Sequence, residues 1–146
     1  MNLGIYLSSL ANHDQLKEIS DTINENLGIK LVDASIFYDD VSFNPFKIKC
    51  GMFNSTDLWN FKGKLVTFSL QATIKASKIV NDIDLYYYYG FEEKINPLSL
   101  IFLLSQNVKI VAKSEGYAND LYRKTKTKPT LVAENLKEFI EKVDHE

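Results

Sequence analysis

The sequence predicts an α/β protein, a single-domain Rossmann-like three-layer αβα sandwich with a mostly parallel sheet. The first observation is that short apolar runs, typical of buried strands, alternate with longer segments in which apolar residues recur at helical spacing. The second is that the chain has 146 residues, of which 45% are apolar, and contains no repeat or linker-like stretch. That length and composition indicate one domain over residues 1–146 with a core of its own.

The first forty residues predict a strand, a helix and a second strand. Residues 3–7 form a short apolar run that ends in a polar turn. Leu16, Ile19 and Ile23 then fall on one face of a helix. An apolar strand follows over residues 31–38. Strand–helix–strand is the repeating unit of a parallel sheet.

The middle of the chain predicts two more strands. Residues 47–53 alternate polar and apolar side chains, as a strand with one wet face does. Residues 55–60 suit one or two turns of helix, and residues 65–68 form a buried type of strand. A helix over residues 69–80, capped by Ser69, follows.

The last third continues the alternation. Residues 84–90 include four consecutive tyrosines, whose β preference predicts a strand with the rings in the core. Pro97 opens a helix over residues 98–104 that is almost wholly apolar, so we expect it to be buried. The remaining predicted elements are strands at residues 108–112 and 130–133 and helices at residues 115–123 and 135–143.

Composition excludes several classes of protein. Seventeen Lys and Arg against nineteen Asp and Glu give a net charge of −2, which argues against bulk nucleic-acid binding. Cys50, the one cysteine, excludes a disulfide framework or a multi-cysteine zinc site, and we expect it to pack as a small apolar side chain. The chain has neither a run of about 18 apolar residues nor a basic, signal-like start, so no membrane span and a cytoplasmic location are expected.

Candidate ligand-binding residues come from the ends of the predicted strands. In an open α/β sheet, ligands bind beyond the carboxyl ends of the strands. The polar residues expected there as ligand contacts are Ser8, Ser9, Asn12, Ser69, Ser114, Glu115 and Asn135. No glycine-rich turn follows the first strand, which argues against a dinucleotide fingerprint or a phosphate-binding P-loop.

Two residues at these strand ends can act as a general base. His13 begins the first helix, although a solvated loop residue is the competing interpretation. Glu92 follows the tyrosine strand, but the chain offers it no identifiable partner acid. The adjacent Asp39 and Asp40 could hold a divalent cation, but we expect them to be turn residues that follow the second strand, and no metal site is predicted.

Several segments resemble one enzyme family. Residues 108–121 (VKIVAKSEGYANDL) resemble the last strand and helix in the N-terminal half of a GT-B-type glycosyltransferase. Residues 128–135 (KPTLVAEN) are similar to the strand, ending in Asn, that leads into the second half. Residues 65–72 and 84–92 resemble glycosyltransferase-like proteins of large bacteriophages, with Gly90 in place of an expected Asp.

The resemblance implies transfer of a sugar from a nucleotide-sugar donor to a hydroxyl acceptor. Glu92 or His13 would be the base, with Ser114 and Asn135 near the ligand. No cofactor or metal would be required, because helix dipoles can stabilise the leaving diphosphate. The nucleotide-sugar would be the substrate.

The sequence ends where the second half of such an enzyme would begin, and this leaves an alternative. The chain would then be a non-catalytic binding or assembly module that keeps the N-terminal type of half. It would act as a homodimer or with a larger glycosyltransferase. A response-regulator hypothesis is set aside, because the required Asp and Lys do not follow the third and fifth strands.

Overall fold

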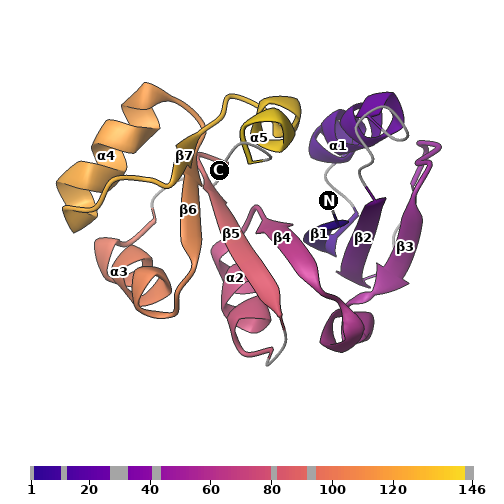
Figure 1. Ribbon diagram of the computed structural model, residues 1–146, viewed down its shortest axis with the longest axis horizontal. Helices are drawn as coiled ribbons and strands as arrows, with labels where there is room; N and C mark the ends of the chain where they lie inside the picture. The colour runs from indigo at the N-terminus through magenta and orange to yellow at the C-terminus, as the bar shows by residue number, and fades with distance from the viewer. Residues whose placement is uncertain are drawn as a thin grey trace.

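A parallel sheet forms the centre of the protein (Figure 1). The computed structural model describes residues 2–10, 13–26, 33–40, 44–79, 82–91 and 95–143. The strands are β1 (Asn2–Ser9), β2 (Asp33–Asp40), β3 (Gly51–Asn54), β4 (Gly63–Thr67), β5 (Ile83–Tyr89), β6 (Lys109–Ala112) and β7 (Leu131–Val132). They lie in the order β3-β2-β1-β4-β5-β6-β7, and all six described pairings are parallel.

Helices cover both faces of this sheet and complete three layers. They are α1 (His13–Asn26), the 3₁₀-helix η1 (Ser55–Asn60), α2 (Leu70–Ser77), α3 (Pro97–Ser105), α4 (Glu115–Thr125) and α5 (Leu136–Val143). Helices α1 and α5 lie side by side on one face (Figure 1). The other core layer contains residues of η1, α2, α3 and α4. The α/β sandwich with a parallel sheet that the sequence predicts is therefore confirmed. None of the helices in the described residues is long and apolar enough to cross a membrane.

The four tyrosines of β5 supply large side chains to both core layers. Tyr86 and Tyr88 pack in the layer of α1 and α5, and Tyr87 and Tyr89 in the layer of α2, α3 and α4. Each is at most 3% exposed, because side chains alternate between the faces of a strand and both faces are covered here. The buried Tyr88 hydroxyl donates a hydrogen bond to the carbonyl of Ala133, just after β7. The predicted core role of the tyrosines is confirmed.

Strand β3 is shorter than the alternation predicts. It comprises Gly51–Asn54, whereas residues 47–49 do not pair with the sheet. The Asn24 side chain of α1 binds this segment instead, donating to the carbonyl of Lys47 at 2.9 Å. The same side chain accepts from the amide of Lys49 at 2.8 Å. A helix side chain thus satisfies backbone groups that a strand would have satisfied by pairing.

The expectation that the apolar helix α3 is buried is wrong for one of its faces. Leu100 and Leu103 are fully buried against the core. Leu98 is 72% exposed, Ile101 46% and Phe102 45%. Because nearly every residue of the helix is apolar, hydropathy alone does not distinguish its buried face from its exposed face.

We predict that Tyr88→Phe lowers the free energy of unfolding by about 1–2 kcal/mol, because the buried Ala133 carbonyl loses its donor. Urea unfolding measures this difference. The matched control is Tyr122→Phe, which removes the hydroxyl of a tyrosine that is 48% exposed and changes stability by less than about 0.5 kcal/mol. Equal losses in the two variants would contradict the structural role of the Tyr88 hydroxyl.

Candidate functional site

A pocket of about 240 Å³ lies at the carboxyl edge of the sheet, between β1 and β4. The chain leaves β1 through α1 on one face and leaves β4 through α2 on the other, so the strand order reverses here. Such a reversal leaves a crevice in which α/β proteins bind ligands. We call it the switch-point pocket; its lining includes Tyr6, Ser8, Ser9, Gln15, Phe68, Ser69 and Phe91.

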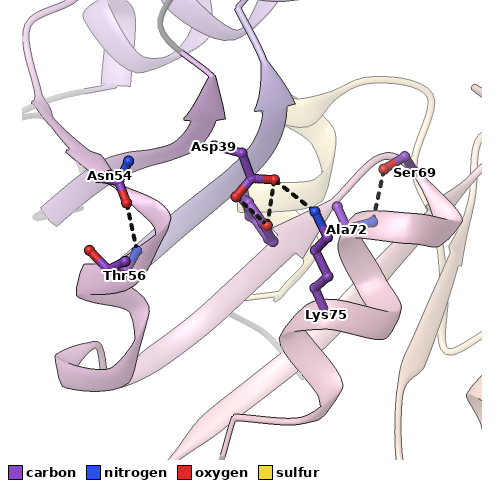
Figure 2. Close-up of polar contacts among 7 residues, drawn as sticks. Asp39, Asn54, Thr56, Ser69, Ala72 and Lys75 are labelled. Atoms are coloured by element: carbon purple, nitrogen blue, oxygen red, sulfur yellow. Dashed lines mark hydrogen bonds and ion pairs between the residues drawn. The ribbon is translucent and has the colours of Figure 1, made fainter.

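Helix α2 begins at the pocket and is held there by a buried hydroxyl network. Ser69 caps the helix by accepting a hydrogen bond from the amide of Ala72 at 3.1 Å (Figure 2). The Thr73 hydroxyl donates to the carbonyl of Ser69 at 2.6 Å and lies 2.6 Å from the Thr67 hydroxyl of β4. The positive end of the helix is therefore fixed against the end of the strand.

The two ends of the pocket differ in charge. On the α1 side, Asp14 and Glu18 border the adjoining surface together with Gln15 and Phe91. The first turn of α2 carries no acidic residue. An anionic group in the switch-point pocket is therefore favoured at the α2 end, beside Ser69.

Two aromatic rings form part of the pocket lining. Phe68 and Phe91 meet edge to face, with ring centres 5.1 Å apart. The Lys113 ammonium lies 4.6 Å from the centre of the Phe91 ring, which brings a positive charge to this wall. Apolar walls with a few hydroxyl and amide groups are the usual composition of a small-molecule site.

The structure brings three of the predicted ligand-binding residues together. Ser8 and Ser9 end β1, Ser69 precedes α2, and all three line the switch-point pocket. Of the other candidates, Asn12 and Glu92 lie outside the described residues. His13 is the first residue of α1, but its side chain is also outside the described part.

Three further candidates lie on the other half of the sheet, beyond β6 and β7. Ser114 caps α4 by accepting from the amide of Tyr117 at 3.3 Å. Glu115 lines a separate pocket of about 360 Å³ that also contains Lys128. Asn135 accepts a hydrogen bond from the amide of Glu138 at 2.9 Å at the start of α5. None of the three lines the switch-point pocket.

A second polar pocket, about 200 Å³ in volume, adjoins the first and shares Tyr6 with it. We call it the Asp39 pocket; its lining includes Tyr6, Asp39, Ser55, Thr56, Trp59 and Lys75. The Tyr6 hydroxyl lies 2.8 Å from each oxygen of the Asp39 carboxylate, and the Lys75 ammonium lies 3.4 Å from Oδ2. Figure 2 shows Asp39 between the turn that carries Asn54 and Thr56 and the helix that carries Lys75.

The expectation that Asp39 and Asp40 are turn residues beyond the strand is wrong, since they are the last two residues of β2. Burial raises the pKa of the Asp39 carboxyl, but hydrogen bonds from Ser55 and Tyr6 and the charge of Lys75 outweigh it, so the net pKa is lowered. Burial and the neighbouring carboxylate raise the pKa of the Tyr6 hydroxyl. At neutral pH the site therefore holds a carboxylate beside a neutral phenol.

The expectation about Cys50 can be compared with the structure. Cys50 packs against the core formed with α1, and burial raises the pKa of its thiol to about 11, which confirms it as a packing residue. Within the described ranges, no three His, Cys, Asp or Glu side chains form a group that could hold a metal ion.

Comparisons of the chain with protein-family models, with curated proteins and with solved structures gave no match.

We predict that Asp39→Asn lowers the free energy of unfolding at pH 7 by about 1 kcal/mol, because the partly exposed carboxylate loses charge-assisted hydrogen bonds. The folded-state pKa of Asp39 lies below the unfolded value, so its stabilisation is present above about pH 4 and is lost as the pH falls through the folded-state pKa. Urea unfolding measures the free energy of unfolding of both proteins at pH 7 and at lower pH. The difference between wild type and variant should become smaller as the pH falls. The control is Asp40→Asn, which changes the adjacent, exposed carboxylate. A stability difference between wild type and Asp39→Asn that does not change with pH would contradict the stabilising role of the Asp39 carboxylate.

Proposed function

We propose that the chain binds a nucleotide-sugar through its phosphates in the switch-point pocket and transfers the sugar to a hydroxyl acceptor. The observation that carries the proposal is the convergence of Ser8, Ser9 and Ser69 in one pocket where the strand order reverses. Hydroxyl groups and the positive end of α2 are suited to bind phosphate oxygens. The absence of an acidic residue from the first turn of α2 favours the same end.

The size of the pocket indicates which part of such a ligand it takes. Its volume of about 240 Å³ is below the roughly 300–1,000 Å³ of sites that enclose a whole small molecule. The pocket therefore suits the phosphate portion, with the remainder of the donor lying along the carboxyl edge of the sheet.

Chain connectivity supports the two candidate bases. Transfer to a hydroxyl requires a group that takes the acceptor proton. Glu92 directly follows Phe91, which lines the pocket, and His13 is two residues before Gln15, which also lines it. Both proposed bases are thus within two residues, in the sequence, of a side chain that lines the pocket.

The alternative is a non-catalytic binding or assembly module, and one observation favours it. Leu98, Ile101 and Phe102 form an exposed apolar group on α3, on the side of the sheet away from α1 and α5. Exposed apolar groups of this kind occur where proteins associate. Under this hypothesis the chain pairs with itself or with a larger glycosyltransferase.

Ligand binding is tested first with UDP-, GDP-, ADP- and CMP-sugars and the free nucleotides. A donor at about 100 times its Kd stabilises the fold by about 2.7 kcal/mol and raises Tm by roughly 5–11 °C. The proposal predicts such a shift for one donor. No shift with any donor at millimolar concentration would contradict it and favour the assembly hypothesis.

Ser69→Ala provides a residue-level prediction. We expect it to weaken binding of that donor about tenfold, or about 1.4 kcal/mol, in a calorimetric titration. Its control is Asn96→Ala, because Asn96 also caps a helix, by accepting from the amide of Leu98 at 2.9 Å, but does not line the pocket. Both variants lose a cap worth about 1 kcal/mol of stability, and only Ser69→Ala should lose affinity. If both variants bind the donor with equal affinity, Ser69 does not contribute to donor binding.

Glu92→Gln tests the chemical step. If Glu92 is the base, the variant transfers sugar at least about 100-fold more slowly in a nucleotide-release assay. Glu93→Gln, which changes the next carboxylate in the chain, keeps its rate. An unchanged rate in Glu92→Gln would eliminate that residue, and His13→Gln would then be measured in the same assay.

A further inference from the structure

The Asp39 pocket contains a combination of groups that the function proposed above does not use. An exposed aromatic ring, a carboxylate, an ammonium group and three hydroxyl-bearing residues line one cavity of about 200 Å³. We propose that this pocket binds the ring of a neutral carbohydrate. The proposal stands whatever the switch-point pocket binds.

Trp59 provides an apolar surface for the sugar ring. It lies on η1 with 57% of its surface exposed, while the neighbouring Leu58 is 1% exposed and anchors the short helix in the core. The Asn54 side chain fixes the start of η1 by accepting from the amide of Thr56 at 3.0 Å (Figure 2). An anchored, flat, exposed indole can pack against the C–H face of a pyranose with little loss of conformational freedom.

The polar groups of the pocket suit neighbouring hydroxyls of a sugar. The Asp39 carboxylate accepts hydrogen bonds from Tyr6 and Ser55, and its side chain is 22% exposed, so its exposed part can still accept from a ligand hydroxyl. The Lys75 ammonium is 3.4 Å from that carboxylate and half exposed, so it can turn toward a ligand oxygen. Thr56 adds a hydroxyl that can donate or accept, while the Ser55 hydroxyl bonds to the Asp39 carboxylate.

The charge of the pocket favours a neutral ligand. One carboxylate and one ammonium group line it, so their charges cancel. A phosphate or a metal cation would be attracted by one of the two groups and repelled by the other. A carbohydrate uses both, because each hydroxyl can donate to the carboxylate or accept from the ammonium.

The test uses Trp59, which is the one tryptophan in the sequence and therefore reports directly on the pocket. The intact chain is titrated with methyl glucoside, methyl galactoside, N-acetylglucosamine and maltose, with glycerol at equal concentration as the solvent control. Fluorescence and the NMR signal of the indole N–H are recorded together. We expect a saturable change with at least one saccharide, with a Kd in the millimolar range, and no saturable change with glycerol.

Variants locate the binding. Asp39→Asn should weaken the saccharide at least about tenfold. The matched control is Asp57→Asn, which makes the same chemical change at a residue of η1 that does not line the pocket. This variant should bind the saccharide with the wild-type Kd. Circular dichroism checks that each variant is folded; if Asp39→Asn is not, Lys75→Gln takes its place and should also weaken binding.

Three results would overturn the proposal. The first is the absence of a saturable change with every saccharide in the folded wild type. The second is equal weakening by Asp39→Asn and Asp57→Asn. The third is saturation by uridine, titrated in the same way, with no response to saccharides, which would assign the pocket to a nucleoside. None of these depends on the donor titration of the switch-point pocket, so the two proposals fail separately.

Discussion

The architecture depends on one constraint, which is that parallel strands must be joined by crossovers that lie on a face of the sheet. Strands β1 and β4 are neighbours, but the crossover after β1 lies on the α1 face and the crossover after β4 lies on the α2 face. The carboxyl edge between these two strands is consequently not covered by either helix. The switch-point pocket lies at this edge, and the Asp39 pocket beside it also contains Tyr6 of β1, so the path of the backbone determines where a ligand can approach.

Periodicity and turn residues were sufficient for the alternation of strands and helices, because each of these elements is stabilised by its own apolar pattern. They were insufficient in two places. The segment at residues 47–49 has a strand-like pattern, yet its backbone groups bond to the side chain of Asn24, which is more than twenty residues away. Helix α3 has no polar face, so the distribution of apolar residues around the helix does not identify the side that packs against the core.

The part of the candidate site that could be predicted is the part whose residues follow directly from the order of the strands. Ser8, Ser9 and Ser69 follow β1 and β4, and the ends of neighbouring parallel strands meet. The Asp39 pocket was not predictable in this way, because it requires the register that sets Tyr6 opposite Phe37 of β2. It also requires contributions from η1 and α2, so no short stretch of sequence contains its pattern. The roles of Glu92 and His13 stay predictions.

The tyrosine strand has a consequence for how the chain selects its register during folding. In most strands a slip by one residue moves apolar side chains to the wrong face, and the cost of exposing them rejects the error. Within a run of four identical residues this penalty is small, since a slipped quartet again presents rings to both layers, and only the flanking residues, such as Asp84, are misplaced. The tyrosine hydroxyl groups also discriminate between registers. Tyr88 donates a hydrogen bond to the carbonyl of Ala133 in one layer, and Tyr89 donates one to the Asp120 carboxylate in the other. In this strand, therefore, polar atoms at the ends of buried side chains add to the flanking residues in favouring the native pairing over a slipped one.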